Sequence, residues 1–125
     1  MKKRALLAIA LSAGLSQTAT ADEAAMVEAG RQLFSHHCTA CHTLDPSKNA
    51  FGPSLIGVVD RPAASMPRFA YSEALQKSGL TWSEANLRKW VEDNEGLVPG
   101  TRMRHVSIKD PAEQDYLISF LKSLK

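Results

Sequence analysis

Two cysteines and a histidine stand together in Cys38-Thr39-Ala40-Cys41-His42, and this C-x-x-C-H pattern constrains the chain more than any other feature. Two thiols at this spacing can each add to one vinyl group of a haem, forming two thioether bonds. The adjacent histidine then lies beneath the iron as an axial ligand. The pattern therefore predicts one covalent haem c, with Cys38 and Cys41 bound to the porphyrin and His42 bound to iron.

Other uses of a C-x-x-C pair find less support in the sequence. A thiol–disulfide redox pair needs a βαβ context, and no such context is indicated here. A zinc site needs further ligands, but the chain contains only 2 cysteines and so has no second cysteine pair. A structural disulfide is also disfavoured, because only two residues separate the thiols and the loop that it closes would be very short.

The N-terminus has the pattern of an export signal. Positive charge at Lys2, Lys3 and Arg4 precedes an apolar run over residues 5–15, and Ala19-Thr20-Ala21 gives a small-x-small cleavage site. The apolar run is shorter than the roughly 20 residues that span a bilayer. We therefore expect a signal peptide over residues 1–21, cleavage after Ala21, and a periplasmic domain over residues 22–125.

Removal of that leader changes the charge of the protein. The leader holds three of the 15 Lys and Arg and none of the 13 Asp and Glu, so the net charge falls from +2 to −1. No block of basic residues remains that could follow a phosphate backbone, which argues against nucleic-acid binding. The 104 residues left are enough for one domain with a marginal core of its own, which a large apolar cofactor would complete. We expect a monomer with no stable membrane insertion.

Hydrophobic periodicity and capping signals predict an all-α domain with long loops. A first helix is expected from about Asp22 to Ser35. A second is expected to start with the capping box Thr81-Trp82-Ser83-Glu84 and to fray near Asn94 to Gly96. A third is expected to start at Asp110-Pro111, an N-cap followed by proline. A short helix is expected over Ser72 to Lys77, stopped by Gly79, and turn-rich stretches separate these segments.

The sixth iron ligand must come from a flexible segment far along the chain. Met103 qualifies, because it lies in the turn-rich segment Pro99-Gly100-Thr101-Arg102-Met103. Methionine opposite histidine raises the reduction potential relative to two histidines. Met66 in another loop and His105 are competitors. Three further candidates have simpler interpretations: Met26 as core filler on the first helix, and His36 and His37 as solvent-facing or hydrogen-bonded side chains.

Several motifs in order resemble those of the class I c-type cytochromes, from about Gly30 to Lys122. Gly30 and Phe34 match the Gly-x-x-x-Phe before the haem cysteines, and Gly52-Pro53-Ser54-Leu55 matches the Gly-Pro-x-Leu after them. The segment from Val98 to Met103 matches the family's methionine loop, with arginine in place of lysine. Leu117 and Phe120 match its last helix.

The resemblance implies the cytochrome c fold, in which three main helices, a short one and long loops surround one haem. It also implies iron ligation by His42 and Met103, and a hydrogen bond from His42 to the Pro53 carbonyl. By the same resemblance, four side chains would contact the haem propionates: Arg61, Tyr71, Trp82 and Thr101.

With both axial positions filled, the iron has no open site, which favours a one-electron carrier over an enzyme. The resemblance implies redox partners such as membrane cytochrome complexes, oxidases or dehydrogenases. One departure from the family pattern is the acidic stretch Glu92-Asp93-Asn94-Glu95-Gly96, because mitochondrial members are lysine-rich there. It predicts a docking face that carries charges of both signs rather than a strongly positive one. Two alternatives remain open at this point: a haem enzyme or sensor with a labile sixth ligand, and a haem subunit dedicated to one dehydrogenase.

Overall fold

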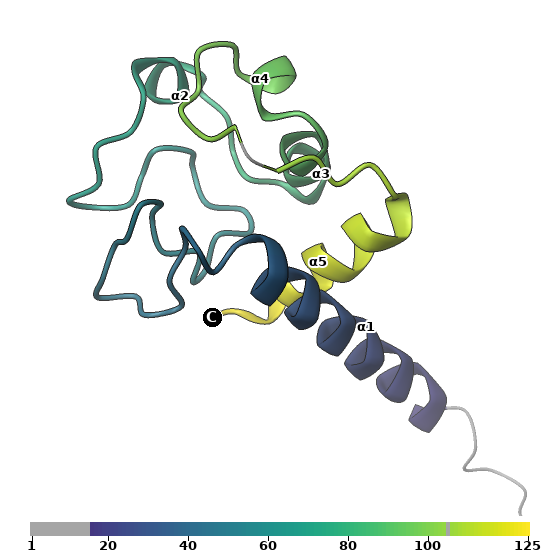
Figure 1. The fold of residues 1–125 in the computed structure, drawn as a ribbon. Coiled ribbons are helices and arrows are strands. Elements are labelled where there is room, and N and C mark those ends of the chain that lie inside the picture. Colours follow the sequence, from purple (N-terminus) through teal and green to yellow (C-terminus); the bar gives the residue numbers. More distant parts are fainter. Residues whose placement is uncertain (1–15, 105) are drawn as a thin grey trace, which may run out of the picture.

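The computed structural model describes residues 16–104 and 106–125. The described chain contains helices and long loops, and its only β-pairing is an isolated bridge between Pro62 and Thr81. This confirms the all-α class. Figure 1 shows the helices in chain order: α1 (Ser16–His37), α2 (Glu73–Lys77), α3 (Glu84–Glu92), α4 (Asn94–Leu97) and α5 (Pro111–Ser123). Among these described helices, none is both long and apolar enough to cross a membrane.

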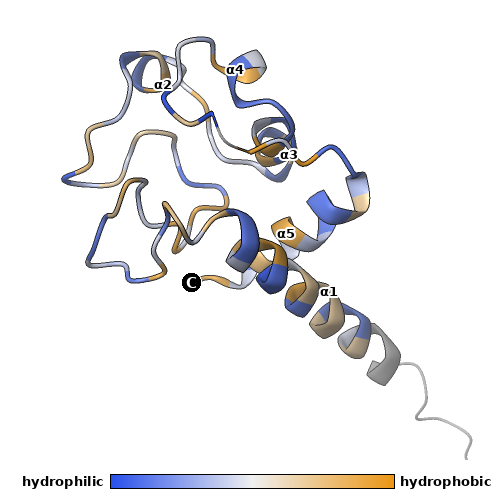
Figure 2. Ribbon diagram, viewed as in Figure 1, coloured by the Kyte–Doolittle hydropathy of each residue, from blue (hydrophilic) through white to orange (hydrophobic). Residues whose placement is uncertain are grey.

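The first and last helices cross at one side of the molecule (Figure 1). Both helices carry hydrophobic residues where they cross (Figure 2), and the Phe34 and Phe120 rings pack there with centroids 5.3 Å apart. Gly30 makes this approach possible, because a Cβ built there would lie 1.9 Å from the Tyr116 carbonyl oxygen. The crossing holds the end of α1, and with it Cys38, against the core.

The start of α1 differs from the sequence-based prediction. The helix begins at Ser16 rather than Asp22, and it therefore includes residues on both sides of the predicted cleavage site after Ala21. No proline or glycine interrupts residues 16–21, so nothing in that stretch stops a helix once the following turns have nucleated it. At the other end α1 runs to His37, two residues past the predicted Ser35.

The predicted starts of α2 and α5 are confirmed. Asp110 caps α5 by accepting a hydrogen bond from the Ala112 amide at 2.8 Å, and Pro111 occupies the first helical position. Ser72 caps α2 in the same way by accepting from the Leu75 amide. Gly79 follows α2 with φ of +64°, a conformation that glycine adopts without steric cost and that ends the helix there.

The predicted start of α3 at Thr81 is wrong. The N-cap is Ser83, whose hydroxyl accepts from the Asn86 amide at 3.2 Å. The preceding residues are pulled into extended pairing, because the Trp82 amide donates to the Arg61 carbonyl and the Trp82 carbonyl accepts from the Asp60 amide. A helix starting at Thr81 would have used the Trp82 carbonyl within the helix, whereas here that carbonyl accepts from Asp60.

The fraying predicted near Asn94 to Gly96 is also wrong. The helix α3 ends at Glu92, and the next residues form the separate short helix α4. Asp93 starts α4 as its N-cap by accepting from the Gly96 amide at 2.9 Å. Asn94 is buried, and its side chain donates to the Trp90 carbonyl at 2.6 Å, which ties the two helices together.

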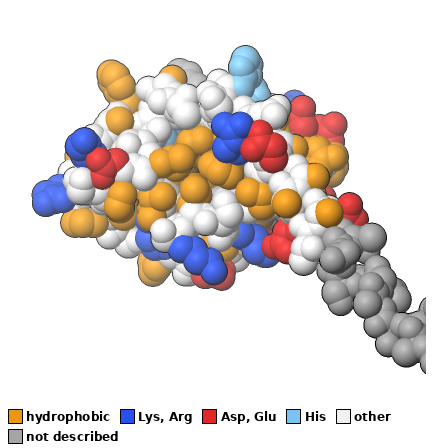
Figure 3. All heavy atoms as spheres, turned by 90° about the horizontal axis from the view of Figure 1, so that it is seen from below, with side chains coloured by type: hydrophobic (Ala, Val, Ile, Leu, Met, Phe, Trp, Pro, Cys, Tyr) orange, Lys and Arg blue, Asp and Glu red, His pale blue; other side chains and the backbone are white. Residues whose placement is uncertain are grey.

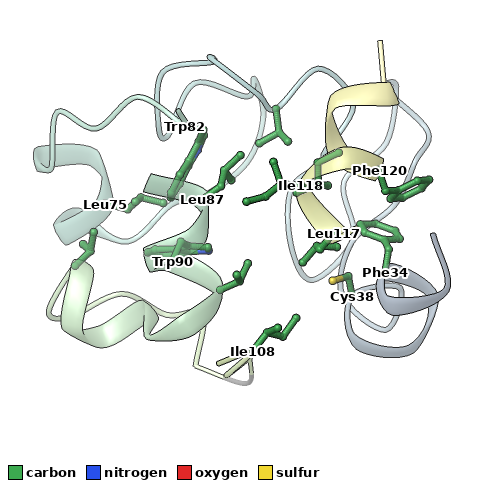
Figure 4. Packing of buried hydrophobic residues seen from close by; sticks show 14 residues of the cluster. Phe34, Cys38, Leu75, Trp82, Leu87, Trp90, Ile108, Leu117, Ile118 and Phe120 are labelled. Atoms are coloured by element: carbon green, nitrogen blue, oxygen red, sulfur yellow. The ribbon is translucent and has the colours of Figure 1, made fainter. Parts of the chain in front are cut away.

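The buried hydrophobic residues form two groups that face each other across the interior (Figure 4). One group lies on α1 and α5 and includes Phe34, Leu117 and Phe120. The other lies on α2 and α3 and in the chain before α3, and includes Leu75 and Trp90. Long loops over residues 43–72 connect the two sides (Figure 1). The interior between the two groups is where the candidate site lies.

Candidate haem site

A cavity of about 410 Å³ lies between the two hydrophobic groups. All eight residues predicted from the sequence to bind the haem or its iron line this one cavity, although they are spread over 66 positions of the chain. They are Cys38, Cys41, His42, Arg61, Tyr71, Trp82, Thr101 and Met103. The rest of the lining is mostly apolar and includes Phe34, Leu75 and Leu87.

The C-x-x-C-H residues form a tight turn that continues directly from α1. The Cys38 amide donates to the Phe34 carbonyl at 2.9 Å, and the His42 amide donates to the Cys38 carbonyl at 2.8 Å. Helical winding of this kind brings residues three and four apart to the same side. It therefore directs Cys38, Cys41 and His42 toward the same cavity, as the sequence predicted.

The two thiols lie in different environments. Cys38 is buried, and burial is the main reason that its thiol pKa rises to about 11, with a smaller contribution from the neighbouring Cys41. Cys41 is only partly buried. Both cysteines are free rather than joined by a disulfide, so both sulfur atoms are available for thioether bonds.

The His42 imidazole is held in one orientation by its neighbours. Its Nδ1 lies 2.8 Å from the Pro53 carbonyl oxygen, so Nδ1–H donates and Nε2 is left with a lone pair for a metal. Burial lowers the pKa of His42, and the Pro53 hydrogen bond opposes that shift. The lowered pKa favours the neutral imidazole, which is the form that binds a metal.

Gly52 allows the loop to pass directly over the imidazole of His42. A Cβ built at Gly52 would lie 2.5 Å from Cε1 and 2.7 Å from Nδ1 of His42, which is closer than van der Waals contact. The Gly52 backbone cannot retreat freely, since its amide donates to the Cys41 carbonyl at 2.7 Å. Glycine is therefore required here for steric reasons, a role that the motif match alone did not explain.

We expect Gly52→Ala to displace the His42 ring and weaken its bond to Pro53. Overpacking of this kind costs about 1–3 kcal/mol, so thermal unfolding of the holoprotein should occur at a lower temperature. The matched control is Gly57→Ala, because no atom lies within 4 Å of a Cβ at Gly57 and its cost comes only from a φ of +64°. Equal losses of melting temperature in the two variants would contradict the steric role of Gly52.

Met103 lies on a loop that closes another part of the cavity. The loop turns at Gly100, whose φ is +88°, and the Arg102 guanidinium fixes it by donating to the Ala70 carbonyl at 2.9 Å. The Met103 sulfur accepts a hydrogen bond from the Trp90 indole N–H at 3.2 Å. This contact was not predicted, because helical periodicity placed Trp90 in the core without showing where its N–H points.

The competing sixth ligands differ from Met103 in position. Met66 is not among the residues that line the cavity, and its sulfur accepts from the Arg61 guanidinium at 3.2 Å. His105 lies outside the described residues. Met26 is half-buried on α1 and does not line the cavity. His36 and His37 are exposed at the end of α1 and contact each other edge to face.

The four residues expected at the propionates all line the cavity, but two of them are engaged with other groups. Arg61 donates to the carbonyls of Ser54 (3.1 Å) and Ile56 (2.8 Å). The Tyr71 hydroxyl accepts from the Met66 amide at 3.2 Å. Burial lowers the pKa of Arg61 and raises that of Tyr71. Trp82 and Thr101 are buried at the cavity wall.

The surface carries charges of both signs. On the face drawn in Figure 3, described Lys and Arg side chains lie beside Asp and Glu side chains around a hydrophobic area. Several form exposed pairs, such as Arg31 with Glu28 and Lys48 with Asp45. Phe51 is 90% exposed and also lines the cavity, so it is an apolar group at the cavity mouth.

The donor set of the cavity fits a covalently attached haem. An apolar interior suits a porphyrin, two free thiols stand on the same turn as a buried neutral imidazole, and a thioether sulfur lies elsewhere on the wall. Arg61 brings a partly buried positive charge that a propionate would neutralise. The geometry therefore defines a candidate site of the c-type haem class.

Comparison with known proteins identifies the family. The family profile described as Cytochrome c matches residues 27–125. Cytochrome c2 iso-2 of Magnetospirillum fulvum is 44% identical over 87 residues, which cover 70% of this chain and 91% of that protein. Cytochrome c2 of Rhodoblastus acidophilus is 39% identical over 99 residues, which cover 78% of this chain and 92% of that protein.

A solved structure agrees with these sequence relatives. Cytochrome cH from Methylobacterium extorquens superposes with a TM-score of 0.73 at 43% identity, covering 78% of this chain and 97% of that one. The chain belongs to the cytochrome c family. It is accordingly an electron-transfer protein with a covalent haem c and its iron, and it is not an enzyme.

Proposed function

We propose that this cytochrome is a periplasmic one-electron carrier whose haem iron is bound by His42 and Met103. The observation that carries the proposal is that both side chains line the same cavity, together with both cysteines of the attachment motif. His42 presents a free Nε2 because Pro53 engages Nδ1. Met103 presents a thioether from a loop that is fixed by Arg102 and Trp90.

Ligation on both sides accounts for electron transfer without catalysis. An iron with two protein ligands has no position for a substrate, and its exchange of one electron then needs little change in geometry. The bound haem supplies a one-electron redox centre, and the polypeptide sets its potential. The means are the identity of the ligands, the apolar surroundings and the hydrogen bonds to the ligands.

Arg61, Tyr71, Trp82 and Thr101 would hold the haem propionates in this proposal. Arg61 is partly buried, so a carboxylate nearby would compensate for the cost of keeping its charge out of water. The indole N–H of Trp82 and the hydroxyls of Tyr71 and Thr101 are groups that can donate to such a carboxylate. Their common position at the cavity wall supports this assignment.

Export to the periplasm would follow from the leader over residues 1–21, with cleavage after Ala21. The mature protein, with a net charge of −1 before the haem is counted, would work as a monomer between membrane or soluble redox proteins, such as a cytochrome complex, an oxidase or a dehydrogenase. The mixed charge of the surface and the exposed Phe51 at the cavity mouth support brief, weak contacts of the kind that electron-transfer proteins make.

A carbon monoxide titration of the ferrous holoprotein tests the proposal. The account predicts very slow and weak binding at neutral pH, because the gas must displace Met103 from the iron. The same titration on a Met103→Ala variant provides the positive control and should give fast, tight binding. Rapid binding by the unmodified protein would support a haem enzyme or gas sensor with a labile sixth ligand instead.

A further inference from the structure

The acidic stretch over residues 92–96 contacts the methionine loop, residues 98–104. The sequence of this stretch predicted a docking face with charges of both signs, but one of its carboxylates is engaged within the protein. Oε1 of Glu95 accepts a hydrogen bond from the Gly100 amide at 3.0 Å. This bond joins α4 directly to the loop that carries Met103.

The second oxygen of the same carboxylate faces the other end of the loop. Oε2 of Glu95 lies 3.8 Å from Nε of Arg104, so the two side chains form an ion pair. The same nitrogen donates to the Thr101 carbonyl at 3.2 Å, which holds the Arg104 side chain against the loop. Glu95 therefore contacts both Gly100 and Arg104, which lie on either side of Met103 in the chain.

The helix that carries Glu95 is anchored in the core. The neighbouring Asn94 is 3% exposed, and its side chain donates to the Trp90 carbonyl at 2.6 Å. The Asn94 carbonyl in turn accepts from the amide of the buried Val98 at 2.9 Å. The methionine loop is not helical and turns at Gly100 with a φ of +88°. A carboxylate on the anchored helix can therefore restrain the loop.

We propose that Glu95 is a positioning residue that restrains the methionine loop and thereby opposes displacement of Met103 from the haem iron. The proposal rests on the proposed ligation by Met103. An external ligand reaches the iron only when the loop carries the Met103 sulfur away from it. Because Glu95 contacts the loop on both sides of Met103, that movement must lengthen or break those contacts.

The two contacts of Glu95 differ in strength. The Glu95 and Arg104 side chains are 53% and 64% exposed, and an ion pair between exposed side chains contributes little to stability. The bond from the Gly100 amide is a hydrogen bond to a charged acceptor, which is the stronger kind of contact. Most of the restraint should therefore come from the bond to Gly100.

Three variants of the holoprotein separate these contributions. Glu95→Ala removes both contacts, whereas Glu95→Gln removes the charge and keeps an oxygen that can accept from the Gly100 amide. Glu92→Ala is the matched control, because it makes the same change in net charge in the same acidic stretch. Glu92 is exposed at the end of α3, and in the described part of the chain no hydrogen bond or ion pair joins its side chain to the methionine loop.

The first measurement is the affinity of the ferric holoprotein for imidazole. We expect Glu95→Ala to bind imidazole about fivefold more tightly than the native protein, because one hydrogen bond no longer opposes the loop movement. Glu95→Gln should differ from the native protein by less than about twofold. Glu92→Ala should bind with native affinity. If Glu95→Ala has a lower melting temperature but the imidazole affinity of Glu92→Ala, Glu95 only stabilises the fold and the proposal is wrong.

The second measurement is hydrogen exchange of the Gly100 amide in the ferrous holoprotein, followed by nuclear magnetic resonance. Exchange should be faster in Glu95→Ala than in Glu92→Ala, since only the first variant loses the acceptor of that amide. Equal exchange rates in these two variants would contradict the restraint of the loop by Glu95.

Failure of the underlying ligand assignment would look different. If Met103 does not bind iron, Met103→Ala will keep the native ferric spectrum and the proposal fails with the assignment. If Met103 binds iron but Glu95 does not restrain it, Met103→Ala will change the spectrum while Glu95→Ala and Glu92→Ala bind imidazole equally. The two results separate an error about the ligand from an error about the residue that positions it.

Discussion

Replacement of Met103 by alanine is expected to abolish the iron–sulfur charge-transfer band of the ferric protein and to lower its midpoint potential. Axial ligands set haem potentials over a range of roughly 0.8 V, and loss of a thioether removes the ligand that favours the ferrous state. The change should therefore exceed that of any substitution at the cavity wall that leaves both proposed iron ligands in place. Absorption spectra and a redox titration of the purified holoprotein measure both effects.

Met66→Ala is the matched control for this experiment. It removes the same side chain from another loop, where the sulfur contacts Arg61 and does not line the cavity. The control variant should keep the charge-transfer band. If Met66→Ala loses the band and Met103→Ala keeps it, the ligand is Met66. If neither variant loses the band, the assignment of a methionine ligand on the basis of position is wrong.

Replacement of Cys41 by serine is expected to give the largest loss of holoprotein. Only Cys38 could then form a thioether, and a serine hydroxyl does not add to a vinyl group under the same conditions. Cys38 lies at the base of the turn and is buried, and burial raises its pKa to about 11, so the remaining thiol is the less accessible of the two and ionises little at neutral pH. The yield of covalently bound haem, measured after denaturation and solvent extraction, checks the prediction.

Thr39→Ser is the control for a change within the same turn. The Thr39 hydroxyl donates to the Ser35 carbonyl at 2.7 Å, and serine can make the same bond while leaving both thiols in place. Its yield of covalent haem should equal that of the native protein. A native yield of covalent haem in the Cys41→Ser variant would contradict attachment through both cysteines.

The attachment motif from Cys38 to His42 was readily predicted from the sequence, because its residues are close together in the chain. Helical winding from Cys38 to His42 depends on local backbone bonds, so the spacing alone indicates which side chains share a face. The N-cap at Asp110 is local in the same sense, and that prediction is confirmed, as is the short helix expected over Ser72 to Lys77, in which Ser72 is the N-cap. The resemblance to class I c-type cytochromes, which is now shown as family membership, added the residues farther along the chain.

The sequence-based predictions were wrong or incomplete where contacts between distant parts of the chain decide the local structure. The residues next to Thr81 match the sequence of a capping box. The backbone of Trp82 nevertheless pairs with that of Arg61, and the N-cap of α3 is therefore Ser83. Spacing also could not show that a Cβ at Gly52 would meet the His42 ring, or that the Trp90 N–H points at the Met103 sulfur. Each of these facts depends on how two loops or helices are placed in space, and one-dimensional patterns do not contain that information.

The absorption spectrum of the purified holoprotein in both oxidation states tests the central claim most directly. Ligation by His42 and Met103 predicts a low-spin ferrous spectrum with two resolved, sharp bands in the visible region. In the ferric state it predicts a weak iron–sulfur band at long wavelength. A high-spin ferrous spectrum, or a ferric spectrum without the long-wavelength band at neutral pH, would contradict a closed iron site and with it the proposed role as an electron carrier.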